Sequence, residues 1–302
     1  MKILITGATG QVGWELARAL LPLGEVTACD RAGADLSQLA SLKQRVETVR
    51  PDLIVNAAAY TQVDAAEQDE ALATRINAEA VGVLAELAKR AGALLVHYST
   101  DYVFDGEKSG PYSETDPTRP LSAYGRSKLA GEQAIAAVGA DSLTFRTTWV
   151  YAARGKNFLR TMLRLAGERD SLRVVADQFG APTSARLLAD WTAHAVRQAL
   201  HERRTGAFES GIYNMTAAGV TTWHGFASAI VAGAIARLPQ GSIKASSIVP
   251  IGTADYPVPA RRPANSVLDN QRLVQRFGLH RPDWESAMNC VLDDLLGVGG
   301  KL

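Results

Sequence analysis

A tyrosine and a lysine, Tyr124 and Lys128, stand four residues apart in the segment AYGRSKLAG. Four residues are slightly more than one helical turn, so on a helix the phenol and the ammonium share one face. The apolar run Leu94–Tyr98 precedes them and leads into Ser-Thr-Asp at 99–101, which is typical of a strand end. Such a phenol can protonate a carbonyl oxygen, and a neighbouring ammonium makes it a stronger acid. Most Tyr-Lys pairs at this spacing are surface neighbours, so a catalytic role also requires a source of hydride.

The first residues of the chain contain a glycine motif that suits a dinucleotide. An apolar run at 2–6 is followed by TGATGQVG and then by an amphipathic helical pattern. Gly7, Gly10 and Gly13 have no side chains, so the backbone can approach a pyrophosphate, whose charge would lie at the helix N-terminus. A glycine triplet alone also fits a tight turn, but its place between a strand and a helix favours a nucleotide.

A second apolar run, Glu25–Cys29, ends in Asp30 and Arg31. A carboxylate somewhat less than ~20 residues past the glycines is typical of a group that binds the ribose hydroxyls of NAD. The adjacent guanidinium could instead pair with the 2′-phosphate of NADP, so we expect the site to accept either NADPH or NADH. Each charge alone could also be a solvated loop residue. Asp35 and Leu36 should lie at the mouth of the sheet, near the adenine.

The alternation of strands and helices continues to about residue 150. Expected strands at 52–56, 94–98 and 143–145 are separated by helical patterns, which predicts an α/β fold with a Rossmann-like, doubly wound parallel sheet. Beyond residue 150 the alternation becomes irregular, which predicts a smaller C-terminal substrate-binding lobe. We expect a dinucleotide-binding domain at 1–150 plus roughly 180–220, and a substrate domain at roughly 151–179 plus 221–302.

The composition fits a globular protein that binds small molecules. The 302 residues are 47% hydrophobic, and 32 basic residues face 31 acidic ones, so no strong field would attract nucleic acid or a membrane surface. No apolar segment is long enough to span a bilayer, and the N-terminus reads as a strand rather than a signal peptide. Two distant cysteines, Cys29 and Cys290, are expected to be reduced, and no residue spacing suggests a metal site. The expected location is the cytoplasm.

Four motifs, taken together in this order and spacing, resemble the extended short-chain dehydrogenase/reductase family: TGxxGxxG from Thr6, NAAA from Asn56, STD from Ser99 and YxxxK from Tyr124. More narrowly, NAAAYTQVDAAE, STDYVFDG, RTTWVY, DQFGAPT and PARRPANS are similar to the members that reduce the C4 keto group of dTDP-4-dehydro-L-rhamnose with NADPH or NADH. This resemblance covers Met1 to roughly Leu295. It implies a dTDP-linked ketosugar as substrate and a product used as a precursor of cell-surface polysaccharide such as lipopolysaccharide.

The resemblance assigns roles to individual residues. Tyr124 would be the proton donor, Lys128 its charged neighbour and the anchor of the cofactor ribose, and Thr100 the hydroxyl beside the carbonyl. Asp101 and Trp149 would contact the substrate, although a tryptophan can equally be a core residue. Cofactor contacts are implied, besides those of the three glycines, Tyr124 and Lys128, for Gln11, Val12, Asp30, Asp35, Leu36, Ala59, Tyr60, Thr61 and Tyr98.

Two other functions remain open from the sequence. A nucleotide-sugar dehydratase or epimerase on the same fold would keep NAD bound, but the related dehydratases carry Thr-Asp-Glu where this chain has Thr100-Asp101-Tyr102. A non-catalytic, nucleotide-binding regulatory subunit is the second alternative, because a regulatory subunit of methionine adenosyltransferase resembles these reductases. The presence of Thr100, Tyr124 and Lys128 favours catalysis.

Two further features, an acidic pair and a basic pair, have no role assigned from the sequence. Some members of the family form a homodimer through Mg²⁺ held by acidic side chains, and Asp293 and Asp294 are acidic residues near the C-terminus, although we assign no metal ligand. Arg261 and Arg262 could contact the nucleotide diphosphate or form a solvated charge cluster. The sequence does not distinguish between these possibilities.

Overall fold

A six-stranded parallel sheet forms the centre of the structure, a computed structural model that describes residues 1–297. Its strand order is β10-β5-β4-β3-β1-β2, which is the doubly wound arrangement expected from the sequence. Four of its strands are buried almost throughout, as parallel strands covered on both faces must be. The strands are β1 (Lys2–Thr6), β2 (Glu25–Cys29), β3 (Leu53–Asn56), β4 (Leu94–Thr100), β5 (Ser142–Thr147) and β10 (Gly211–Asn214).

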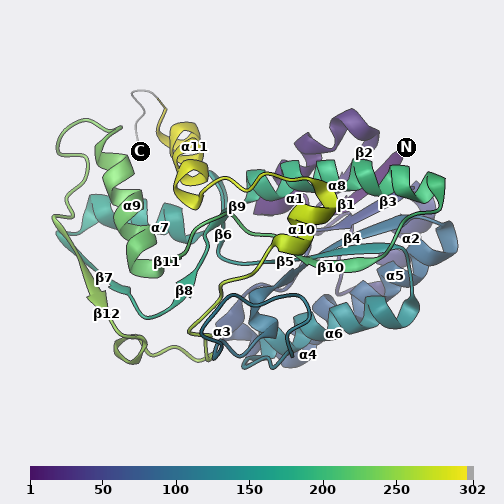
Figure 1. Cartoon of the computed structure of the whole chain (residues 1–302), viewed down its shortest axis with the longest axis horizontal. Coiled ribbons are helices and arrows are strands. Elements are labelled where there is room, and N and C mark those ends of the chain that lie inside the picture. The colour runs from purple at the N-terminus through teal and green to yellow at the C-terminus, as the bar shows by residue number, and fades with distance from the viewer. Residues whose placement is uncertain (298–302) are drawn as a thin grey trace.

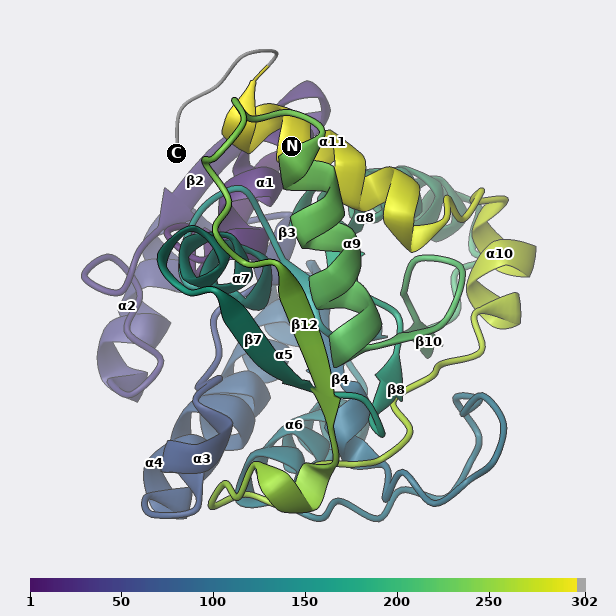
Figure 2. The same ribbon diagram turned by 90° about the vertical axis from the view of Figure 1, so that its left-hand side faces the viewer.

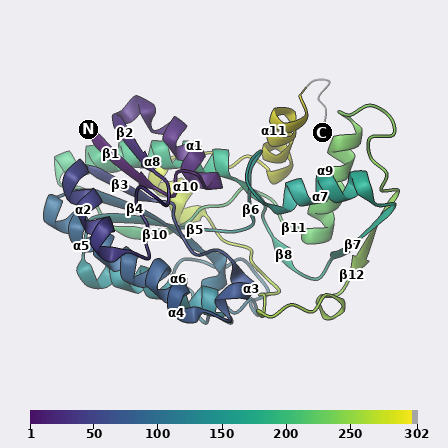
Figure 3. The same ribbon diagram turned by 180° about the vertical axis from the view of Figure 1, so that it is seen from behind.

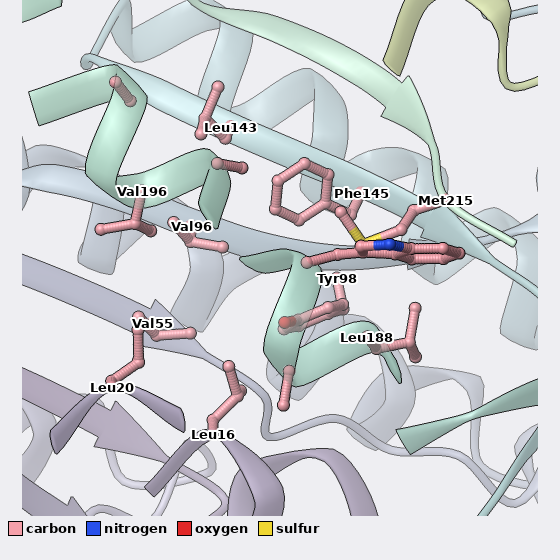
Figure 4. Close-up of a cluster of buried hydrophobic side chains, with 14 of the residues drawn as sticks. Leu16, Leu20, Val55, Val96, Tyr98, Leu143, Phe145, Leu188, Val196 and Met215 are labelled. Carbon is pink, nitrogen blue, oxygen red and sulfur yellow. The ribbon is translucent and has the colours of Figure 1, made fainter. Parts of the chain in front are cut away.

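Helices cover both faces of this sheet (Figures 1 and 3). One face packs against α1 (Gln11–Ala19), α8 (Ala185–Thr205) and α10 (Gln271–Phe277), and the other against α2 (Leu39–Val49), α5 (Ala80–Ala91) and α6 (Ala123–Val138). Figure 4 shows the first of these cores, in which Tyr98 and Phe145 of neighbouring strands pack near Leu188 of α8. Apolar burial on two faces therefore holds the strand ends in a fixed arrangement.

A smaller lobe has a core of its own (Figure 2). It contains α7 (Phe158–Glu168), α9 (Trp223–Ile235), α11 (Trp284–Leu296) and a parallel pair formed by β7 (Ser171–Val175) and β12 (Ser247–Ile251). Two short pairs lie between this lobe and the sheet: β6 (Val150–Tyr151) with β9 (Thr183–Ser184), and β8 (Phe179–Gly180) with β11 (Thr221–Thr222). Among the described residues, no helix combines the length and apolar character needed to cross a bilayer.

The chain crosses between the two cores more often than the expected domain boundaries assume. Those boundaries assign all of 221–302 to the substrate domain, yet Leu273, Phe277 and Leu279 pack in the core beneath the sheet. A division that follows the cores would place 271–279 with the dinucleotide-binding domain. The division into domains remains a proposal, and its last residues, 298–302, lie outside the described part of the chain.

Several local elements differ from the sequence predictions. The helical pattern between the expected strands at 52–56 and 94–98 is interrupted, because α4 (Glu70–Thr74) passes into a π-helical turn, η2 (Arg75–Glu79), before α5 begins. Ser37 is of a residue type that favours N-caps, but α2 begins only at Leu39. Instead, Asp35 accepts a hydrogen bond from the Ser37 amide at 2.9 Å and turns the chain before the helix. The remaining short helices are η1 (Leu21–Leu23), α3 (Val63–Ala66), η3 (Asp101–Val103) and η4 (Thr253–Asp255).

Candidate active site

The glycine turn after β1 leaves no room for side chains. Gly7 has φ +73°, and a Cβ there would lie 2.7 Å from the Ala58 amide nitrogen. A Cβ on Gly13 would lie 2.1 Å from the Gly7 carbonyl oxygen, so α1 can approach the turn only with glycine at this position. Within residues 1–297, no side chain caps α1 at Gly10. The first amides of α1 are therefore available to an anion, and the turn fits a dinucleotide pyrophosphate.

The end of β2 lies beside this turn, because the Ala8 amide donates to the Cys29 carbonyl at 2.9 Å. Asp30 is exposed there, and its Oδ1 accepts a hydrogen bond from the Gly33 amide at 2.9 Å. The Arg31 side chain is 77% exposed and lies 3.5 Å from Asp35 Oδ2. Asp30 and Arg31 are thus placed where either could meet a cofactor ribose. Leu36 is buried in the core on the α2 side of the sheet.

Asn77 fixes the segment that follows β3. Its Oδ1 accepts from the Tyr60 amide at 2.8 Å, and its Nδ2 donates to the Tyr60 carbonyl at 3.0 Å and to Ser127 Oγ at 3.0 Å. Asn77 lies in the π-helical turn η2 and is fully buried. Sequence reasoning missed this residue, although an asparagine within a helical pattern is a weak helix former and so a possible signal. The segment Ala59–Thr61, expected to contact cofactor, is therefore tied to α6.

Lys128 is buried beneath the expected nicotinamide site. Its ammonium donates to the Tyr98 carbonyl at 2.6 Å and lies 3.3 Å from His97 Nε2. Burial lowers the pKa of Lys128 to about 8. The Tyr98 side chain points to the opposite face of β4, where its hydroxyl lies 2.6 Å from Thr192 Oγ1. Only the main chain of Tyr98 therefore reaches the group around Lys128.

Tyr124 lies in the first turn of α6, which Ser122 caps by accepting a hydrogen bond from the Gly125 amide at 3.1 Å. The expectation that Lys128 makes this phenol a stronger acid is not met in the structure. Burial raises the pKa of Tyr124, and the charge of Asp101 raises it further, while the Thr100 hydroxyl lowers it. The lysine ammonium points instead toward β4, which explains the difference.

Thr100 and Asp101 form the polar end of β4. Thr100 Oγ1 donates to Asp101 Oδ1 at 3.0 Å, and both residues are at least 95% buried. Burial raises the pKa of Asp101 to about 6. Asp101 Oδ2 is buried and makes no hydrogen bond of good geometry among the described residues, although the Ser266 and Thr148 hydroxyls lie close enough to lower the pKa of Asp101.

The two arginines of the PARRPANS segment have different surroundings. Arg262 donates to Asp64 Oδ2 at 2.9 Å and also interacts with the Tyr102 hydroxyl. The Tyr102 ring meets the Tyr124 ring edge to face, with centroids 5.5 Å apart. Arg261 has a 70% exposed side chain and lies 4.0 Å from Glu107. Arg262 is thus connected to the active site, whereas Arg261 is a solvated charge.

Trp149 lies between the two lobes. Its indole stacks on that of Trp223, and a Cβ added to Gly180 would lie 2.7 Å from the Trp149 ring. Trp223 is held in turn by a 3.2 Å hydrogen bond from its Nε1 to Gln178 Oε1. Trp223 begins α9, and no local signal in the sequence connects it with Trp149.

The first turn of α1 contacts the smaller lobe. Asn157, the N-cap of α7, donates from Nδ2 to Gln11 Oε1 at 2.9 Å, and the Arg154 guanidinium lies 3.5 Å from the centre of the Trp14 ring. Val12 packs against the core between α1 and the sheet. Gln11 is therefore placed both at the expected pyrophosphate site and at the junction of the lobes.

The acidic residues considered for Mg²⁺ already have partners within the chain. Asp293 Oδ1 accepts from Arg237 at 2.8 Å, and Asp294 Oδ2 lies 2.7 Å from an Arg186 nitrogen. Over residues 1–297, no three His, Cys, Asp or Glu side chains are grouped as metal ligands. Both cysteines are free thiols, Cys29 buried and Cys290 exposed.

The ends of β1, β3 and β4 thus bring together two features. One is the glycine turn, which fits a dinucleotide, and the other is the group formed by Tyr124, Thr100 and Lys128. Such a group can bind a nicotinamide dinucleotide and give a proton to an oxygen. The Trp149–Trp223 stack and the buried Asp101 carboxylate are the further candidates for the substrate side of this site.

Comparison with known proteins agrees with this geometry. The chain is 63% identical over 296 residues to the dTDP-4-dehydrorhamnose reductase of Burkholderia thailandensis, covering 98% of this chain and 99% of the relative. It is 47% identical over 300 residues to the enzyme of that name from Escherichia coli K12, covering 98% of each. A solved dTDP-4-dehydrorhamnose reductase from Clostridium acetobutylicum superposes with TM-score 0.86 at 35% identity, covering 98% of this chain and 99% of that one. One from Bacillus anthracis, in complex with NADP, superposes with TM-score 0.86 at 33% identity, covering 97% and 99%.

These matches confirm the resemblance and the Rossmann-like fold expected from the sequence. The model of the RmlD substrate binding domain family matches residues 1–296, nearly the whole described chain. The chain belongs to this family, together with the dTDP-4-dehydrorhamnose reductases that it resembles over their full length.

Proposed function

We propose that this protein reduces the C4 keto group of dTDP-4-dehydro-L-rhamnose to give dTDP-L-rhamnose, with NADPH or NADH as reductant. The observation that carries this proposal is the placement of Tyr124 and Lys128 on one face of α6, with Thr100 at the adjoining end of β4. The names of relatives up to 63% identical support the choice of substrate. The product would be a precursor of cell-surface polysaccharide such as lipopolysaccharide, made in the cytoplasm.

The residues of the chain divide the work of binding and proton transfer. The uncapped first turn of α1 and the glycine turn would hold the pyrophosphate, and Asp30 or Arg31 the ribose beside adenine. The segment at 59–61, fixed by Asn77, would line the path between adenine and nicotinamide. A bound nicotinamide supplies the hydride that the C4 carbon accepts.

Tyr124 supplies the proton. As hydride reaches the C4 carbon, negative charge builds on the carbonyl oxygen, and the Tyr124 hydroxyl donates its proton there. The Thr100 hydroxyl would turn its single hydrogen from Asp101 to the same oxygen. The raised pKa of Tyr124 keeps the phenol protonated at neutral pH, so the donor is ready before hydride transfer. Lys128, whose ammonium donates to the Tyr98 carbonyl, would hold the cofactor ribose rather than lower the pKa of Tyr124.

The choice between NADPH and NADH rests on the end of β2. Arg31 is exposed enough to turn toward a 2′-phosphate, while the Asp30 carboxylate would bind a free ribose hydroxyl. The NADP complex of the Bacillus anthracis relative supports a nicotinamide cofactor at this position. We therefore propose that both cofactors are accepted. A homodimer is a further proposal, and gel filtration or ultracentrifugation would test it.

The decisive test is incubation with NADPH and dTDP-4-dehydro-L-rhamnose, following NADPH absorbance and identifying the sugar product. Wild-type protein should oxidise NADPH and form dTDP-L-rhamnose. Tyr124→Phe should lose turnover by ~10²–10⁴ while its NADPH affinity stays close to wild type, because only the proton is removed. Tyr256→Phe removes a hydroxyl from an exposed tyrosine and serves as the control. No NADPH consumption by the wild type would refute the assignment.

The dehydratase and epimerase alternative is disfavoured by Tyr102. Where the dehydratases carry a carboxylate, this chain has a phenol whose pKa is raised by burial, so it is not a base at neutral pH. Protein that keeps NAD through gel filtration and turns over without added NADPH would reverse this conclusion. Protein that binds NADPH but shows no turnover would favour a regulatory subunit.

A further inference from the structure

His97 is a fully buried, titratable side chain that the proposed reaction does not yet use. It lies in β4 next to Tyr98, and because side chains alternate along a strand it points to the face covered by α6. There its Nε2 lies 3.3 Å from the Lys128 ammonium, and its Nδ1 lies 3.1 Å from Asn56 Nδ2. Asn56 Oδ1 accepts from Thr6 Oγ1 at 2.6 Å. A continuous polar chain therefore runs from Lys128 to the residue before Gly7.

The hydrogen-bonding capacity of these groups restricts how they can be protonated. Burial and the charge of Lys128 both lower the pKa of His97 well below its usual value, so the ring is neutral. A neutral imidazole carries one N–H, and its other nitrogen is an acceptor. An ammonium can only donate, so while Lys128 is charged, Nε2 must accept and Nδ1 must carry the hydrogen.

This tautomer also fixes the orientation of Asn56. A hydrogen on Nδ1 needs an acceptor, so the Asn56 amide must turn its oxygen toward His97 and its nitrogen toward Thr6, whose hydroxyl can accept. The structure places Asn56 Nδ2 toward His97 and Asn56 Oδ1 toward Thr6, an orientation that suits the opposite tautomer and an uncharged lysine. The Nδ1–H tautomer therefore requires the Asn56 amide to be turned over from this orientation. The protonation of Lys128 and the tautomer of His97 are therefore coupled through geometry.

No other charged group near Lys128 is described as accepting a hydrogen bond from its ammonium. Glu132, one turn further along α6, favours the ammonium through its charge, but both its oxygens bind Arg146 of β5, at 2.9 and 2.6 Å. Tyr124 packs edge to face against Tyr102. On β5, the residue opposite His97 is Thr144, which carries no charge. Among the contacts described for the Lys128 nitrogen, His97 is the side-chain acceptor and the Tyr98 carbonyl is the main-chain acceptor.

We propose that His97 is a positioning residue for Lys128: as the Nδ1–H tautomer, it accepts one ammonium hydrogen at Nε2 and keeps the lysine charged and aimed at the active site. The Tyr98 carbonyl takes a second ammonium hydrogen. Tetrahedral geometry then leaves the third ammonium hydrogen directed away from these two acceptors, where a cofactor ribose hydroxyl could accept it. This inference rests on the proposed function, in which Lys128 acts as a charged group.

Two variants distinguish the contribution of His97 Nε2 from that of His97 Nδ1. Glutamine at 97 can place an acceptor near the Nε2 position and still serve Lys128, whereas asparagine reaches only the Nδ1 position and can serve Asn56 alone. His97→Asn should move the alkaline limb of the kcat/KM profile down by about one pH unit, because the ammonium loses one hydrogen bond. His97→Gln should leave that limb near its wild-type position. Equal shifts in both variants, or none in His97→Asn, would overturn the proposal.

A measurement on the wild-type protein avoids any dependence on folding of the variants. In protein labelled with ¹⁵N-histidine, two-bond correlations identify the tautomer of each of the five rings, and His97→Gln identifies the missing signal. We expect His97 as the Nδ1–H tautomer near pH 7. An Nε2–H tautomer or a charged ring at that pH would contradict the proposal. Because this readout needs no substrate, it remains decisive even if the proposed reductase activity fails its own test.

Discussion

The indole of Trp149 lies nearly flat against that of Trp223, with ring centroids 3.7 Å apart and planes 15° apart. Trp149 follows β5 of the central sheet, whereas Trp223 begins α9 of the smaller lobe, so the stack joins the two lobes. Trp149 also has φ +48°, a left-handed conformation that is costly for a residue with a side chain. Contacts around the ring must therefore hold it in place, and Trp223 provides the largest flat surface.

Replacing Trp223 should weaken substrate binding more than cofactor binding. We expect Trp223→Ala to raise KM for the sugar nucleotide about tenfold, because loss of an aromatic stack releases the neighbouring indole. Trp223→Phe should retain most of the affinity, and Ile235→Ala, an exposed position on the same helix, serves as the control. Steady-state kinetics with NADPH titrations would measure both constants. A normal sugar-nucleotide KM in Trp223→Ala would separate this stack from the substrate site.

Gly180 tests the other side of the Trp149 ring. A Cβ there would lie 2.7 Å from the Trp149 ring atom Cε2, too close for any real contact, so Gly180→Ala must displace the ring or the β8 backbone. We expect a lower melting temperature and a kcat/KM reduced at least as much as in Trp223→Ala. Gly110→Ala is the matched control, since among the described residues no atom lies within 4 Å of a Cβ built there. Identical behaviour of the two variants would show that the ring is not confined.

The parts of the site that are local in sequence were predictable. Gly7, Gly10 and Gly13 lie in one turn, and Tyr124 and Lys128 lie one turn apart on one helix, so local spacing places them. The strand pattern predicted the sheet because parallel strands covered on both faces are continuous apolar runs.

Other features depend on packing between distant segments. Asn77, His97 and Trp223 gain their roles from partners 17 to 74 positions away along the chain, which no local pattern reveals. Strand β12 was missed because most of its residues are exposed and it lacks a buried face. The sequence also predicted the wrong direction for the shift of the Tyr124 pKa. Helical spacing places Lys128 nearby but does not show where its ammonium points.

Asn77 should control cofactor affinity. Asn77→Ala would leave the Tyr60 amide and carbonyl without their partners, at a cost of about 1–3 kcal/mol for each buried group left unpaired. The freed segment at 59–61 should raise the Kd for NADPH, with a smaller effect on KM for the sugar nucleotide. Gln62→Ala, at an exposed position beside the segment, is the control. Fluorescence titration with NADPH measures the change, and an unaltered Kd would show that this segment does not contact the cofactor.

Asp101 should reduce stability at neutral pH, because its carboxylate is buried. Its pKa is raised by burial to about 6 from 3.8, so between about pH 4 and 6 the folded state binds more protons and stability falls as pH rises. Above pH 6 the full penalty applies, on the order of 3 kcal/mol. Asp101→Asn should therefore raise the free energy of unfolding in urea at pH 8, with a gain that shrinks toward pH 4, while kcat/KM falls.

Asp105→Asn is a control of opposite sign. A hydrogen bond from Tyr112 lowers the pKa of Asp105, so removing that carboxylate should destabilise the protein at pH 8. A destabilised Asp101→Asn protein at pH 8 would mean that the carboxylate is stabilised by its surroundings rather than strained by them.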